Sequence, residues 1–74
     1  MTKEDIVETR AAIDDVGAEI IKIRRIKRQM KIYQKSHPQN PDALTLAQGM
    51  EIQYKQLLKA EMVLRAHLED LIKQ

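Results

Sequence analysis

A short stretch rich in helix-breaking residues, KSHPQNPDAL at residues 35–44, separates two long segments that have helical periodicity. The residue before a proline is disfavoured in the α conformation, so Ser36-His37-Pro38 predicts the end of one helix. Asn40-Pro41-Asp42 predicts the start of another, because Asn caps helices, Pro fits the first helical position and Asp suits the first turn. A connection this short, about five residues, forces the two helices to run antiparallel.

The segment before this turn carries a stripe of side chains with helical spacing. Its members recur at intervals of three and four residues: Ile6, Thr9, Ile13, Val16, Ile20, Ile23, Ile26, Met30 and Tyr33. Such spacing is typical of one buried helix face. Thr2 is a candidate N-cap, and the acidic residues that follow it suit the helix dipole. A helix is therefore predicted from about residue 3 to about residue 35.

The segment after the turn has a more regular stripe, in which intervals of four and three alternate. Its members are Ala43, Ala47, Met50, Tyr54, Leu57, Glu61, Leu64, Leu68 and Leu71. Glu61 is the polar member, and we expect it to pair with Arg65 four residues later. The pattern predicts a second helix over about residues 41–73. Residues 1–74 are then a single all-α domain, an antiparallel two-helix hairpin centred near residue 39 with its turn at about residues 36–40.

More apolar side chains lie outside these stripes than a two-helix hairpin can bury. They include Val7, Ile21, Ile32, Leu44, Leu58 and Met62. A helix that packs on one neighbour needs an apolar arc of only about 100°. The chain has 74 residues and no Cys, so its small core has no disulfide to support it. We expect the hairpin to complete its core with another protein or with a second copy, as a homodimer.

Basic residues are concentrated in the second half of the first helix. Residues 20–36 contain seven Lys or Arg and no acid, whereas residues 1–19 contain six acids and two bases. Arg24, Arg28, Lys31 and Lys35 share one helix face. This face could bind an acidic protein, bind nucleic acid, or simply be solvated and complement the helix dipole. Nucleic acid is the least favoured of the three, because only Tyr33 interleaves with the basic residues.

The apolar side chains outside the stripes and the basic face together define a predicted partner-binding surface. Its candidate residues are Ile21, Arg24, Arg28, Lys31, Ile32, Leu44, Leu58 and Met62. Apolar members supply the contact area, and the bases steer the encounter with the partner.

Catalytic chemistry has few candidate groups in this sequence. Ser36 is the only serine, and His37 and His67 fall near opposite ends of the hairpin, so no catalytic triad or two-His metal site is expected. TRAAIDDVGAEII, residues 9–21, is similar to the opening of the helical chorismate mutases. Pro38, however, stands where that family has a further lysine, and the family's third helix is lacking. We therefore expect no enzymatic activity, no metal and no cofactor.

Neither a membrane span nor a secretory signal is predicted. No run of 18 apolar residues occurs, and the opening MTKEDIVE is acidic and lacks an apolar core. A cytoplasmic protein without membrane insertion is expected.

The second helix resembles the second half of the needle subunits of bacterial type III secretion. The matching residues are Pro38-Gln39-Asn40-Pro41, Asp42, Ala47-Gln48, Gln53-Tyr54, Glu61, Leu64-Arg65 and Asp70-Leu71. In that family a Pro-x-Asn-Pro turn joins two helices. The first helix here is longer and more basic than a needle subunit's, and the family's apolar C-terminal tail is lacking. This resemblance implies a structural polymer.

Nearly the whole chain resembles the small helical-hairpin co-chaperones of those needle subunits. Residues in comparable register are Met1-Thr2, Ile20-Ile21, Arg25, Arg28 and Asn40-Pro41. The resemblance implies a non-enzymatic adaptor that helps a tetratricopeptide-type, helical-repeat chaperone to keep the needle subunit soluble before export. The well-signalled first helix favours this function over the needle subunit itself. A dimeric hairpin that binds nucleic acid is a further alternative.

Overall fold

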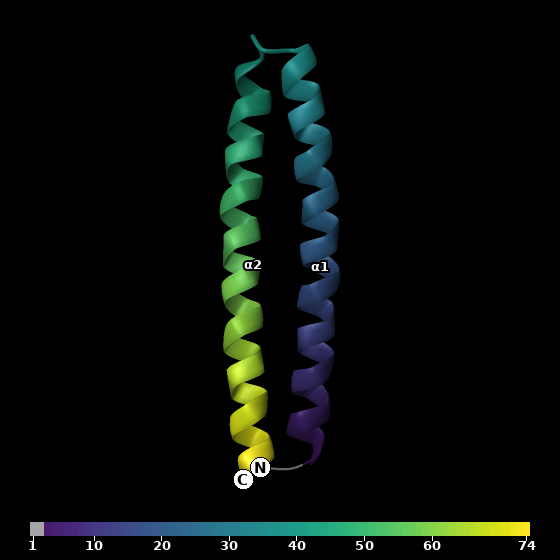
Figure 1. Ribbon diagram of the computed structural model, residues 1–74, viewed down its shortest axis with the longest axis vertical. Coiled ribbons are helices and arrows are strands. Elements are labelled where there is room, and N and C mark those ends of the chain that lie inside the picture. The colour runs from purple at the N-terminus through teal and green to yellow at the C-terminus, as the bar shows by residue number, and fades with distance from the viewer. Residues whose placement is uncertain (1–2) are drawn as a thin grey trace.

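The computed structural model describes residues 3–74 as two long antiparallel helices (Figure 1). Helix α1 spans Lys3–Ser36 and helix α2 spans Pro41–Lys73. Together they form a rod of 55 × 14 × 12 Å, with the start of α1 and the end of α2 at one end and the turn at the other. The described residues contain no strand. The predicted all-α, antiparallel two-helix hairpin is confirmed.

The helix ends agree closely with the expected ones. Helix α1 continues one residue past the predicted end, because the backbone N–H of His37 donates to the Tyr33 carbonyl oxygen at 2.9 Å and closes a last turn that includes Ser36. Helix α2 begins at Pro41, as predicted. The proposed N-cap of α1, Thr2, lies outside the described residues.

Asn40 ties the turn to both helices. Its side-chain oxygen accepts hydrogen bonds from the backbone N–H groups of Asp42, at 3.0 Å, and Ala43, at 3.4 Å. Its side-chain nitrogen donates to the Tyr33 hydroxyl at 3.0 Å. The His37 ring stacks on Tyr33, with centroids 4.1 Å apart and an interplanar angle of 12°. One residue therefore caps α2 and holds the last turn of α1 beside it.

The two helices meet along a seam in which intervals of three and four residues alternate strictly. The seam residues of α1 are Ile6, Thr9, Ile13, Val16, Ile20, Ile23, Lys27, Met30 and Gln34, and all are buried or half-buried. Those of α2 are the nine stripe residues predicted for that helix, and all nine are likewise shielded. The expected Glu61–Arg65 pair forms, with Arg65 Nε 3.7 Å from Glu61 Oε1.

The predicted α1 stripe is wrong at two positions. Ile26 and Tyr33 are 42% and 43% exposed, and Lys27 and Gln34 take their places in the seam. Strict alternation places residues 27 and 34 at the contact, and a residue one position earlier is rotated by about 100°. The apolar character of Ile26 and Tyr33 concealed this, because the seam accepts polar residues at both positions.

Cross-helix contacts place the centre of the hairpin at residue 39. Arg24 contacts Tyr54, and Lys27 contacts Glu51. Each pair lies symmetrically about residue 39 in the sequence, so the predicted centre is confirmed.

The core is thin for a chain of this length. Its buried hydrophobic residues are Ile13, Ile20, Ile23, Ala43 and Leu71. No side chain of residues 3–74 is less than 2% exposed. Large apolar side chains that the sequence places outside the stripes stay in solvent, from 53% exposed for Ile21 to 71% for Met62. Leu58 differs from them, because it is half-buried beside the seam.

Removing the cap should weaken the whole hairpin. Asn40→Ala leaves two N–H groups of α2 without an acceptor and Tyr33 without a donor, so we expect the free energy of unfolding to fall by about 1–2 kcal/mol. Urea unfolding followed by circular dichroism measures the change. Gln39→Ala in the same turn is the matched control. Equal stabilities of the two variants would contradict this role of Asn40.

Candidate interaction surface

Two long sides of the hairpin surface flank the seam, and the outer surface of each helix lies between them. Each residue of a helix is rotated by about 100° from the one before it, so residues that directly follow a seam residue lie on one side. Residues that directly precede a seam residue lie on the other. Because the helices are antiparallel, the following residues of α1 and α2 lie on the same side of the rod, as Arg24 and Glu51 illustrate, which are joined through the seam residues Tyr54 and Lys27.

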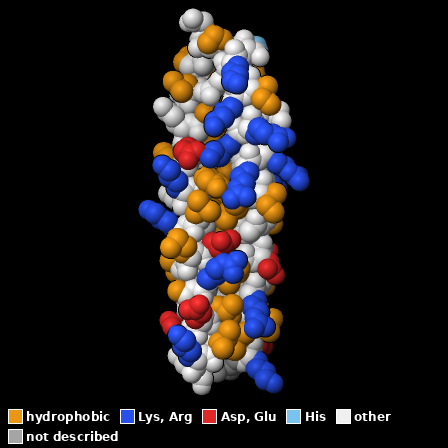
Figure 2. All heavy atoms as spheres, in the orientation of Figure 1, with side chains coloured by type: hydrophobic (Ala, Val, Ile, Leu, Met, Phe, Trp, Pro, Cys, Tyr) orange, Lys and Arg blue, Asp and Glu red, His pale blue; other side chains and the backbone are white. Residues whose placement is uncertain are grey.

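The side formed by residues that follow the seam is both basic and apolar, and we call it the basic side. Its charged members are Arg10, Arg24, Arg28, Lys31, Lys35, Lys55 and Arg65 against Asp14, Glu51 and Glu69, a net charge of +4. Its large apolar members are Val7, Ile21, Leu44, Leu58, Met62 and Ile72. Figure 2 shows Lys and Arg side chains gathered mainly over the half nearest the turn, with hydrophobic side chains between them.

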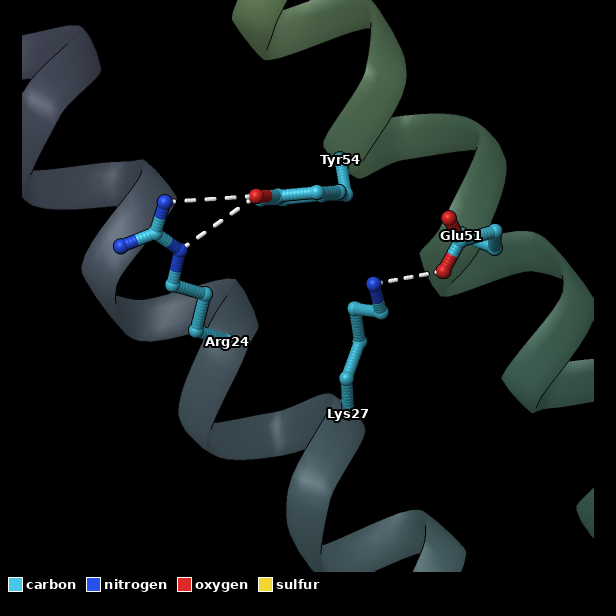
Figure 3. A network of polar contacts seen from close by, with 4 residues as sticks. All are labelled: Arg24, Lys27, Glu51 and Tyr54. Atoms are coloured by element: carbon cyan, nitrogen blue, oxygen red, sulfur yellow. Dashed lines mark hydrogen bonds and ion pairs between the residues drawn. The ribbon is translucent and has the colours of Figure 1, made fainter.

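A polar network joins α1 to α2 on this side (Figure 3). Arg24 donates to the Tyr54 hydroxyl from Nε at 3.4 Å and from Nη2 at 3.3 Å. The Lys27 ammonium lies 4.1 Å from the centroid of the Tyr54 ring and forms an ion pair with Glu51. Only 22% of the Lys27 side chain is exposed, so its charge is held between the ring face and the carboxylate.

The network forms one wall of a shallow groove that presents mainly cations. The groove has a volume of about 220 Å³ and is lined by Arg24, Lys27, Arg28, Lys31 and Tyr54. Lys27 is paired with Glu51, but Arg28 and Lys31 form no ion pair within residues 3–74. Their charges are therefore available to an acidic partner.

Lys27 also sets the protonation behaviour of Glu51. The hydrogen bond from Lys27 lowers the pKa of Glu51 from its ordinary value of 4.5. Partial loss of hydration opposes this, and the charges of Lys27, Lys55 and Lys31 reinforce it. The carboxylate is consequently ionised, and the ion pair complete, throughout the neutral range.

Seven of the eight predicted partner-binding residues lie on the basic side. They are Ile21, Arg24, Arg28, Lys31, Leu44, Leu58 and Met62. Ile32 is 53% exposed, but it lies on the outer surface of α1, away from both the seam and this side. The hairpin thus brings together residues from both helices that are up to 41 positions apart in the sequence.

Sequence reasoning missed the network that organises this surface. Glu51 was not a candidate, and neither Lys27 nor Tyr54 was expected to contact the other. The available signal was the alternation of the seam, which places Lys27 at a contact position level with Glu51 and next to Tyr54 once the hairpin is centred on residue 39. The ring and the carboxylate compensate for the lysine charge at that position.

The two histidines lie apart in the structure. His37 is in the turn, stacked on Tyr33, and its Nδ1 is 3.2 Å from the Tyr33 carbonyl oxygen. His67 is exposed on α2. Residues 3–74 contain no group of three or more His, Asp or Glu side chains arranged to hold a metal ion.

Comparison with known proteins identifies no relative of this chain. No protein-family model matches the chain, and no curated protein or solved structure is significantly similar to it. Within the described part of the chain, neither helix has a stretch that is long and apolar enough to cross a membrane.

The lowered pKa of Glu51 makes hairpin stability sensitive to acid. The ion pair contributes fully above pH 4.5, the ordinary pKa, and its contribution is lost as the pH falls through the lowered pKa of the folded state. Glu51→Gln should therefore reduce the loss of unfolding free energy between neutral and acidic pH. Urea unfolding at several pH values measures this. The exposed Glu69→Gln is the control, and an unchanged pH profile for Glu51→Gln would contradict the assignment.

Proposed function

We propose that this chain is a non-enzymatic adaptor that binds an acidic, amphipathic partner through its basic side. The observation that carries the proposal is that unpaired bases and exposed apolar side chains occupy the same side of the rod. Met62 is 71% exposed and Leu44 is 54% exposed, on the side that also presents Arg28 and Lys31. Apolar area supplies affinity in such contacts, and charge complementarity supplies association rate and orientation.

The shape of the hairpin suits a helical partner. A straight rod 55 Å long offers a continuous strip over which another helix can lie, and helix-in-groove contacts are a common mode of recognition. The thin core of the hairpin is a second, energetic reason to expect a partner. Burying side chains such as Ile21 and Met62 against a partner adds the apolar area that two helices cannot provide alone.

The specific form that we propose is a co-chaperone of type III secretion. In this function the basic side docks on a tetratricopeptide-type chaperone, and the two proteins together keep a needle subunit soluble in the cytoplasm. The resemblance of nearly the whole chain to small hairpin co-chaperones supports this assignment, as does a surface that combines an apolar strip with a steering charge.

Nucleic acid is the alternative occupant of a basic surface, and the apolar content favours protein over it. Tyr54 is the aromatic residue on the groove, but Lys27 covers its ring face, so the ring is not open for stacking with a base. Ile21, Leu44 and Met62 have no role in contacting phosphates.

Co-expression tests the proposed function. The chain should co-purify with a tetratricopeptide-type chaperone and a needle subunit from the same genome, and Met62→Asp should weaken the complex about tenfold or more. Val63→Asp is the matched control, because Val63 is 67% exposed but lies on the opposite side of the hairpin. Isothermal titration calorimetry gives both affinities.

Three outcomes would overturn the proposal. One is the absence of any complex, and another is equal weakening by Met62→Asp and Val63→Asp. The third is tight, strongly salt-dependent binding of RNA or DNA that neutralising Arg24 and Arg28 abolishes, since this would assign the basic side to nucleic acid.

A further inference from the structure

The side of the hairpin opposite the basic side has the reverse charge, and we call it the acidic side. It consists of the residues that directly precede the seam. Its charged members are Asp5, Glu8, Asp15, Glu19, Asp42 and Asp70 against Lys22, a net charge of −5. It also has exposed apolar side chains, namely Ile26, Tyr33, Leu46 and Val63. The hairpin therefore presents two long sides of opposite charge, both with apolar contact area.

We propose that the acidic side binds the basic side of a second copy of this chain, with the two rods antiparallel. The same side of two copies cannot pair favourably, since basic would face basic or acidic would face acidic. Net charges of +4 and −5 on opposite sides make the contact between unlike sides the complementary one. This inference does not rest on the proposed function, because it concerns the purified chain alone.

The positions of the charges along the rod select the antiparallel orientation. Lys31 lies about 17 Å from the middle of α1 towards the turn, and Glu8 lies about 17 Å from it in the other direction. Arg24 and Asp15 are placed in the same way, each about 7 Å from the middle. Reversing the second rod brings both bases to the same height along the rods as both acids. In a parallel arrangement, the bases in the half of the rod nearest the turn would face no acid on the acidic side of the second copy before Asp42.

The apolar side chains match in the same arrangement. Distances are again taken from the middle of α1, with residues of α2 placed level with their partners in the register centred on residue 39. Val7 and Ile72, on the basic side, then lie about 19–20 Å from the middle towards the open end. Leu46 and Tyr33, on the acidic side, lie about 19–20 Å from the middle towards the turn. All four are at least 43% exposed in the single hairpin. Antiparallel packing therefore covers both clusters at once.

The size of the sides is adequate for such a contact. Specific interfaces bury roughly 800 Å² on each partner, which is about the footprint of one side of a rod measuring 55 by 14 Å. A contact between unlike sides leaves one basic and one acidic side free at the two ends of the assembly, so further copies can add. Self-association is then open-ended, and it competes with the acidic partner for the basic side.

Sedimentation velocity on the purified chain is the primary test. At low salt we expect the average mass to rise with protein concentration beyond that of a dimer, and high salt should shift the equilibrium towards single hairpins because these charges are solvent-exposed. A monomer at every concentration in low salt would overturn the inference. A mass that stops at two copies would also overturn it, since that indicates contact between like sides.

Charge reversal identifies the surfaces. Arg28→Glu with Lys31→Glu lowers the net charge of the basic side from +4 to 0, and Glu8→Lys with Asp15→Lys raises that of the acidic side from −5 to −1. Each double variant then lacks one of the two charged sides, so each alone should remain a single hairpin. Mixing the two should restore association. Asp14→Lys is the matched control: Asp14 neighbours Asp15 but lies on the basic side, and its reversal should leave self-association intact. Helical circular dichroism verifies that every variant is folded.

Two results would contradict the assigned surfaces. Failure of the mixed double variants to associate, while the unmodified chain does, would show that other residues make the contact. Equal loss of self-association in Asp14→Lys and in Asp15→Lys would show that the effect depends on net charge and not on the side that carries it.

Discussion

The strictly alternating seam between α1 and α2 is the constraint from which the other features of this hairpin follow. Two helices can bury only the side chains between them, so a seam of nine positions per helix leaves the remaining surface in solvent. The seam also defines the two sides, because one residue of displacement in either direction rotates a side chain by about 100°. Charge and exposed apolar area are distributed with respect to this division, with bases mostly after seam residues and acids mostly before them.

Lys27 shows how a polar residue at the seam is accommodated. A buried lysine without partners would be costly, but the Tyr54 ring and the Glu51 carboxylate both lie against its ammonium group. Arg24 extends the same network through the Tyr54 hydroxyl. These contacts couple α1 to α2 at the edge of the basic side, so the network that favours one register of the hairpin also fixes the groove proposed to meet a partner.

Much of the candidate surface could be predicted from the sequence, and its errors have a common cause. The spacing of Arg24, Arg28 and Lys31 placed them on one helix face, and the structure brings Leu44 and Met62 to the same side. Ile32 was included because it is apolar and outside the stripe, but lying outside the stripe does not say on which side a residue lies. Ile26 was assigned to the seam because it is apolar and lies three residues after Ile23, although Lys27 occupies that position.

The sequence by itself determined the two helices, their ends, the turn and the centre of the hairpin, because these depend on local signals and on periodicity within each segment. Pro38, Asn40 and Pro41 act on neighbouring backbone, and regular spacing in α2 identifies its contact face without reference to α1. Only the tertiary structure decided which residues of the two helices share a side, and that Glu51 and Tyr54 are the partners of Lys27. Those facts depend on the rotation of each helix about its own axis, which is set by packing between helices and not by either segment alone.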